Sequence, residues 1–210
     1  MQIFSQLFSL KPATRLRLNI VLYLLSKSEL MNSNKSFAST NYELAYYEAQ
    51  TFLTVAEEIR KKAQSILLSG IAEQSQGINT NNIEKSIGLQ YAEHVNHAFA
   101  VELLLKCIMI MEDGQYYLGH DLFALFDKLR PLTQLTISAR FDEYRVHRRN
   151  RVYFGFMESV TILDVLNEAQ EAFKDFRYLF EQKERPSYDL STVVECLEYY
   201  IKQQKPDLKF

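Results

Sequence analysis

The sequence contains little cysteine, glycine or proline, and neither sign of charge is in strong excess. Its 210 residues include 2 Cys, 6 Gly and 4 Pro. Because Cys107 and Cys196 lie far apart in apolar segments, we expect neither a disulfide framework nor a zinc site, and they suit a reducing compartment. The net charge is −2, so affinity for nucleic acid must come from a local patch rather than from the whole chain.

Long apolar runs and the motifs of several enzyme classes are also missing. The most membrane-like run, NIVLYLL at 19–25, is far shorter than the roughly 20 apolar residues that span a bilayer. No signal-peptide cleavage site follows it, so we expect a cytoplasmic protein with no membrane partner. There is no glycine-rich phosphate loop, nucleophile elbow or zinc ribbon, and we expect no cofactor. His94 and His97 share a helical face, but no matching ligand cluster accompanies them, so no metal site is expected.

Helical periodicity dominates what is present. Hydrophobic residues make up 47% of the chain, and they predict a substantial core. Residues 42–69 carry apolar side chains at intervals of mostly three or four. These are Leu44, Tyr47, Phe52, Val55, Ile59, Ala63, Ile66 and Leu67. A second long helix is predicted at 82–111, and its second half, FAVELLLKCIMIM, is typical of the central helix of a bundle. Further helices are predicted at 15–30, 121–129, 132–149, 159–181 and 190–203. No strand is predicted, so the expected fold class is all-α.

Two motifs stand close together in the middle of the chain. AFAVELLLKCIMI, at 98–110, places Glu102 and Lys106 four residues apart in an apolar helix, and GHDLFALFDKL, at 119–129, follows after a glycine-containing loop. Together they resemble the motifs of the HEPN superfamily, all-α domains found in bacterial toxins, phage-defence proteins and RNA-processing factors. FKDFRYLFE, at 173–181, resembles an arginine–tyrosine signature of some HEPN-like families.

The resemblance implies a domain organisation and a chemistry. A HEPN-like helical bundle is expected at 42–182, with an N-terminal helix and linker at 1–41 and a C-terminal helical extension at 183–210. Such bundles commonly form homodimers through their long helices. Active members cleave RNA without a metal. They use an Arg that stabilises the phosphate and, after four to six intervening residues, a His that acts as acid or base toward the ribose 2′-hydroxyl.

The stretch RFDEYRVHRRNRVYF, at 140–154, contains this spacing. Arg140 and His147 have six residues between them. Seven helical positions turn through almost two revolutions and rise about 10.5 Å, so both side chains are expected on one face. Arginine binds phosphate with a planar charged fork, and histidine exchanges protons near neutral pH. The residue after Arg140 is not the polar one usual in active members, whereas Arg149–Asn150 has the polar residue but no histidine at the expected positions.

Other functions fit the same stretch. Residues 140–151 hold five Arg against Asp142 and Glu143, a local excess of three positive charges, which is common on a solvated helix face. The same charges, together with aromatic side chains that stack on unpaired bases, fit RNA binding. The candidate RNA-binding residues are Tyr144, Arg145, Arg148, Arg149, Asn150 and Arg151.

The residues of the two resembling motifs are predicted to be structural. Glu102 and Lys106 are spaced for an intrahelical pair, and in so apolar a helix they are expected to anchor a polar link to the GHDL loop. His120 is expected to bond a backbone group or the carboxylate of a neighbouring helix. Asp121 is expected to accept a bond from the first-turn amides of the helix that follows.

Two hypotheses of different classes follow. In the first, the chain is a HEPN-like homodimer that engages RNA through the arginine-rich helix, as in a toxin–antitoxin or phage-defence system with a cognate antitoxin. Cleavage by Arg140 and His147 is left open. In the second, it is a non-catalytic helical module that binds a protein partner or a nucleotide, and the Arg149 motif is a vestige.

Overall fold

The computed structural model describes residues 41–78, 81–149, 160–169 and 190–208. At 146–149 it describes the backbone and not the side chains. Within these ranges the regular elements are all α-helices, so the all-α class is confirmed. Their bounds are α3 Tyr42–Ser75, α4 Asn82–Asp113, α5 Leu122–Asp127, α6 Pro131–Arg149, α7 Ile162–Glu168 and α9 Ser191–Gln204. The helix predicted at 15–30 and the segment at 173–181 lie outside the described residues.

Side chains at three helix starts determine where those helices begin. The Asn41 side chain accepts a bond from the first turn of α3 at 3.1 Å. Asp121 Oδ1 accepts one from the Ala124 amide of α5 at 2.9 Å, as predicted. Thr161 and Asp164 form a reciprocal capping box at the start of α7. Each cap satisfies an amide that has no partner within its own helix.

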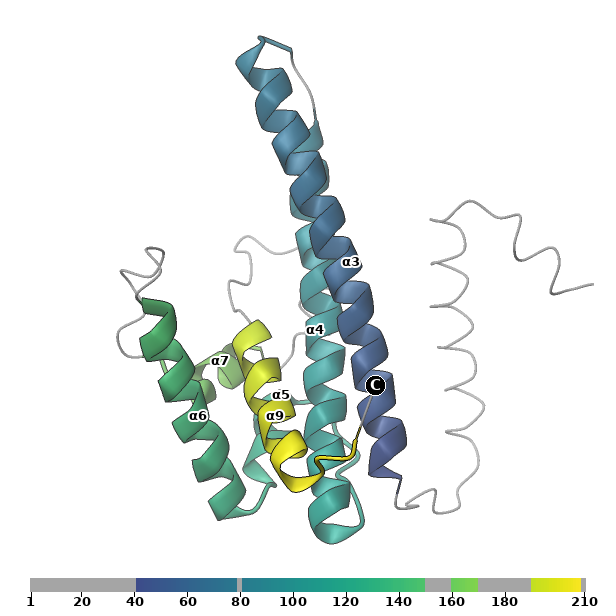
Figure 1. Cartoon of the computed structure of the whole chain (residues 1–210), viewed down its shortest axis with the longest axis vertical. Helices are drawn as coiled ribbons and strands as arrows, with labels where there is room; N and C mark the ends of the chain where they lie inside the picture. Colours follow the sequence, from purple (N-terminus) through teal and green to yellow (C-terminus); the bar gives the residue numbers. More distant parts are fainter. Residues whose placement is uncertain (1–40, 79–80, 150–159, 170–189, 209–210) are drawn as a thin grey trace, which may run out of the picture. The chain divides into compact units, whose positions relative to one another are not determined.

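The long helices α3 and α4 lie side by side (Figure 1). Four small residues of α3, each seven positions after the last, are buried: Ala49, Ala56, Ala63 and Gly70. A seven-residue repeat keeps one seam of a helix facing its neighbour, and small side chains there let the two backbones approach closely. A Cβ added to Gly70 would lie 3.0 Å from the Cβ of Asn82 in α4. In the same seam, the Ser86 hydroxyl donates to the Ala63 carbonyl oxygen at 2.9 Å.

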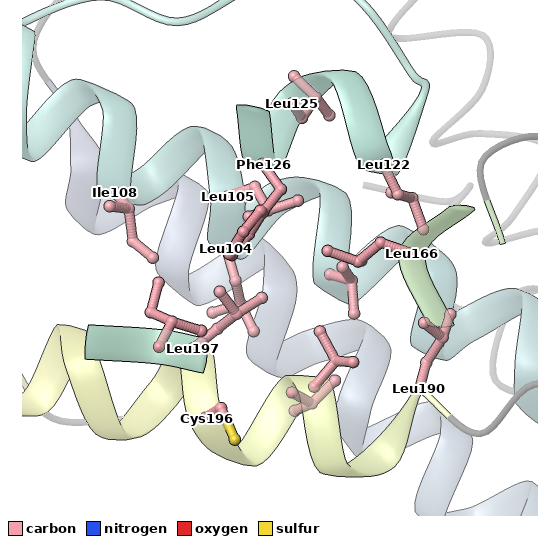
Figure 2. Packing of buried hydrophobic residues seen from close by; sticks show 14 of the residues in the cluster. Leu104, Leu105, Ile108, Leu122, Leu125, Phe126, Leu166, Leu190, Cys196 and Leu197 are labelled. Atoms are coloured by element: carbon pink, nitrogen blue, oxygen red, sulfur yellow. The ribbon is translucent and has the colours of Figure 1, made fainter. Parts of the chain in front are cut away.

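The second half of α4 lies at the centre of the hydrophobic core, as its composition predicted. Val101, Leu104, Leu105 and Ile108 are fully buried. Figure 2 shows Leu104, Leu105 and Ile108 of α4 in one buried cluster with residues of α5, α7 and α9 and with the residue before α9, which are Leu122, Leu125, Phe126, Leu166, Leu197 and Leu190. Cys107 and Cys196 are both buried and both free of disulfides. The core therefore joins residues as far apart in the sequence as Tyr46 and Ile201.

α9 contributes to the core, although residues 183–210 were expected to form an extension: Val193, Cys196 and Ile201 are fully buried in the same cluster as residues of α4. The helix predicted at 159–181 also differs: α7 starts at Ile162, after its capping box, and ends at Glu168. Asn167, a poor helix former, occupies its last turn.

Helix α4 is long and apolar enough to cross a membrane by length and composition, and among the described residues it is the one helix that passes this test. In the most apolar 18-residue stretch of α4, 56% is buried inside the protein. A buried core helix has the same composition as a membrane span, and the packing of α4 against α3, α5 and α9 is that of a core helix.

Candidate functional site

Arg140, the first candidate catalytic residue, is held between α6 and α9. Its guanidinium carbon lies 4.5 Å from the ring centre of Tyr144 and 4.2 Å from that of Tyr199. One guanidinium nitrogen donates to Glu143 at 2.7 Å and another to the Tyr144 hydroxyl at 3.4 Å. These hydrogen bonds raise the pKa of Arg140 above its ordinary value. Arg140 is therefore charged and already engaged by a carboxylate and two aromatic rings.

The rest of the arginine-rich stretch is described only in part. Arg145 pairs with Asp142 at 3.5 Å. α6 continues through Arg149, so the backbones of His147 and Arg148 lie on the predicted helix. The side chains of these three residues, and all of Asn150 and Arg151, lie outside the described residues. That the imidazole of His147 lies on the same face as the guanidinium of Arg140 stays a prediction.

The two carboxylates of the stretch are matched with its first two arginines. Glu143 binds Arg140 and Asp142 lies beside Arg145. Three further arginines of the stretch, Arg148, Arg149 and Arg151, follow in the sequence.

A second polar centre lies where α4 meets the loop before α5, and it contains the predicted link. Glu102 is 2% exposed. Its Oε1 accepts from Lys106 Nζ at 2.7 Å and lies 3.0 Å from Nδ1 of His120. An ionised carboxylate only accepts hydrogen bonds, so the proton of this contact is on Nδ1. Glu102 Oε2 is buried without a hydrogen-bond partner.

The His120 side chain is much more exposed than the carboxylate that holds it, at 64% against 3%. The Lys106 side chain is 12% exposed, and its ammonium nitrogen lies 5.5 Å from the ring centre of Tyr116. The buried Glu102–Lys106 pair thus has no net charge and supports an imidazole that reaches solvent. A carboxylate on one ring nitrogen fixes the tautomer and the orientation of a histidine.

The loop beside His120 displays aromatic side chains. Tyr116 is 36% exposed, Tyr117 51% and Leu118 86%. A Cβ on Gly119 would lie 2.7 Å from the Tyr117 ring, so glycine is needed for the ring to take this position. Lys128 Nζ lies 5.9 Å from the centre of the same ring. The loop therefore combines exposed rings with a nearby positive charge.

A third polar network was not predicted. Glu112 Oε1, near the end of α4, accepts from the hydroxyl of Thr133 in α6 and from that of Tyr200 in α9, the latter at 3.1 Å. Arg130 donates to the Glu112 carbonyl oxygen at 2.6 Å and to Asp113 at 2.7 Å. Burial raises the pKa of the Tyr200 hydroxyl. The network ties three helices together, and no local sequence pattern marks it.

In the part of the chain that the structure describes, no group of three or more His, Cys, Asp and Glu residues is arranged to hold a metal ion. No family model, curated protein or solved structure matches the chain. The HEPN resemblance therefore rests on the motifs of the sequence alone.

Proposed function

We propose that the chain is a HEPN-like RNA-engaging protein that binds single-stranded RNA through the arginine-rich end of α6. The proposal includes a homodimer and metal-independent RNA cleavage in a toxin–antitoxin or phage-defence system of the cytoplasm. The observation that carries it is the charge balance of the stretch: both carboxylates are matched with Arg140 and Arg145, and three further arginines follow. Arginine binds phosphates through its planar charged fork, and each phosphate bound makes the affinity depend on salt.

Salt dependence tests the binding. Each phosphate neutralised on a single strand contributes about −0.7 to the slope of log affinity against log salt. We expect Arg148→Ala/Arg149→Ala to weaken binding and to make the slope shallower by about 1.4. The control variant Lys61→Ala/Lys62→Ala removes the same charge from exposed positions of α3. We expect it to leave the RNA affinity and the salt slope unchanged. RNA binding that is absent from the wild type, or that both double variants lower equally, would refute a site on α6.

Cleavage by Arg140 and His147 is tested in EDTA with labelled RNA. His147→Ala and Arg140→Lys should both lose cleavage if the two residues act together, because lysine keeps the charge but not the planar fork. Equal cleavage by all three proteins would indicate a contaminating nuclease or a different centre.

A non-catalytic interaction module is the second candidate, and the geometry of Arg140 favours it. Arg140 already donates to Glu143 and to the Tyr144 hydroxyl and contacts the rings of Tyr144 and Tyr199, so these groups compete with a scissile phosphate for it. Salt-dependent RNA binding without cleavage, or capture of a protein partner without RNA binding, would favour this class.

Light scattering tests the homodimer. α3 exposes Leu68 at 67% and Ile71 at 52%, three positions apart, and exposed apolar side chains on one helix face support association. We expect a dimeric mass that Leu68→Glu/Ile71→Glu reduces to a monomer. A wild type that is monomeric at high concentration would refute the dimer.

A further inference from the structure

The polar centre of α4 joins an exposed histidine to a buried carboxylate. Lys106 lies on the same helix as Glu102 and donates to it at 2.7 Å, so the contact with His120 is what ties this carboxylate to the loop. His120 adds a second contact to the same buried oxygen while its ring stays 64% exposed. A buried carboxylate on Nδ1 directs the other ring nitrogen, Nε2, away from the carboxylate. This is the arrangement in which an imidazole acts as a base.

The surroundings of His120 fit a single-stranded nucleic acid. Tyr116 and Tyr117 precede it in the chain, are partly exposed, and are close to the ammonium groups of Lys106 and Lys128. Exposed aromatic rings stack on unpaired bases whatever the sequence, and adjacent cations bind the backbone phosphates. Lys106 is nearly buried on Glu102. Lys128, which follows α5 and lies beside the Tyr117 ring, is exposed and is the cation that would meet a phosphate.

We propose that the loop between α4 and α5 is a second RNA site, in which His120 accepts the 2′-hydroxyl proton, Tyr116 and Tyr117 stack on bases, and Glu102 positions the imidazole. This inference rests on the proposed function and assigns its chemistry to a different histidine from His147. The 2′-oxygen attacks the adjacent phosphorus and the bond from phosphorus to the 5′-oxygen breaks. The proton taken up by Nε2 of His120 returns to the departing 5′-oxygen. The products are a 2′,3′-cyclic phosphate and a 5′-hydroxyl, with no net change in protons or electrons.

Cleavage of labelled single-stranded RNA by the full chain in EDTA tests this assignment, with the same sequence in DNA as a substrate that lacks the 2′-hydroxyl. We expect RNA but not DNA to be cut, and mass spectrometry to find the cyclic phosphate. His120→Gln should lower the cleavage rate by about 10²–10⁴-fold while RNA affinity stays within a factor of about two. His94→Gln is the matched control, because it removes an imidazole from α4 outside this loop, and it should cleave at the wild-type rate.

Two further variants separate positioning from stacking. Glu102→Gln keeps the shape of the side chain and removes its charge, and we expect at least a tenfold lower kcat. Nitrogen NMR of His120 should show the Nδ1–H tautomer in the wild type and a mixture of tautomers in Glu102→Gln, a change that lost packing alone would not produce. Tyr117→Ala should raise KM with little effect on kcat, since stacking binds substrate and transition state alike.

The outcomes separate this site from the one on α6. Wild-type protein that binds RNA but leaves it intact overturns the assignment of His120 and leaves RNA binding by α6 standing. Cleavage that persists in His120→Gln and is lost in His147→Ala overturns it in favour of the pair predicted from sequence. A wild type that binds no RNA overturns the proposed function itself. Cleavage lost in His120→Gln, with binding retained, supports the site.

Discussion

The buried pair of Glu102 and Lys106 allows a prediction in which the loss of stability depends on which of the two side chains is removed. The pair spans 2.7 Å, with side chains 3% and 12% exposed. Lys106→Met leaves the carboxylate buried with His120 as its remaining polar contact. Removing one partner of a buried ion pair costs about 3–5 kcal/mol. Glu102→Met should cost less, because the long lysine side chain can carry its ammonium to water.

The double variant Glu102→Met/Lys106→Met should be close to the wild type. Replacing both charges with apolar side chains of similar volume removes their desolvation penalty together with their attraction, and such replacements are often neutral or stabilising. The Nδ1 of His120 then bonds to water, which its exposed side chain can reach. We expect the double variant to unfold within about 1 kcal/mol of the wild type. The coupling energy between the two sites should therefore be at least about 2 kcal/mol.

Urea unfolding followed by circular dichroism at a helix band measures all four proteins. With a slope of about 2.5 kcal/mol per molar urea, Lys106→Met should lower the midpoint by more than about 1 M, while the double variant shifts it by less than about 0.4 M. Single variants that each cost under about 1 kcal/mol and add without coupling would show that the pair is solvated. A double variant as unstable as Lys106→Met would refute the compensation.

Three other outcomes follow from described contacts. Gly70→Val should destabilise the fold by about 1–3 kcal/mol, because its added atoms meet α4. Gly88→Ala has open space around its Cβ and should stabilise the fold by about 0.5–1 kcal/mol. The midpoints of urea unfolding measure both changes. Burial raises the pKa of Cys107 to about 12, so about one ten-thousandth of this thiol is ionised at pH 8. Iodoacetamide should label it readily only in urea, and fast labelling of the folded protein would contradict the burial. Hydrogen bonds from the backbone and side chain of Thr161 lower the pKa of Asp164 below 3.8. The stability from this cap is therefore present above the unfolded pKa of Asp164 and lost as the pH falls through its folded pKa. Thr161→Val removes the hydroxyl and keeps the backbone N–H, which is the larger cause, so it should move the NMR titration of Asp164 upward by part of the shift. An unchanged titration would show that the hydroxyl does not lower this pKa.

The positions of the helices could be predicted from the periodicity of apolar residues. The face of α3 that packs against α4 could not. The predicted apolar face included Leu44 and Tyr47, which are 55% and 41% exposed. The seam toward α4 consists of alanines and a glycine seven positions apart. A search that weights large apolar side chains overlooks such a seam, because close approach of two helices requires small residues. The heptad spacing of Ala49, Ala56 and Ala63 was the available signal.

The contacts of the candidate sites could also be predicted only in part. The spacing of Glu102 and Lys106 predicted their pair, which is present. His120 beside a helix start predicted a bond to a backbone group or to the carboxylate of a neighbouring helix, and in the structure it contacts the carboxylate of Glu102. The position of Arg140 between Tyr144 and Tyr199 was not predictable, since Tyr199 is 59 positions away in the sequence and reaches α6 only because α9 packs in the core. Local spacing reports contacts within one helix or its adjoining loop. Contacts between helices depend on packing.

The expected neutrality of the double variant also bears on what the polar centre does. If replacing Glu102 and Lys106 with methionine leaves the free energy of unfolding unchanged, the fold does not need the buried charges, and the stability of the core comes from the apolar neighbours of α4. The remaining effect of the pair is on His120, whose Nδ1 loses its carboxylate while its exposed ring stays in the loop. A double variant that is stable, binds RNA and no longer cleaves it would separate positioning from folding within one protein. If that variant cleaves at the wild-type rate, the carboxylate does not position the imidazole, and Glu102 serves only the link between α4 and the loop.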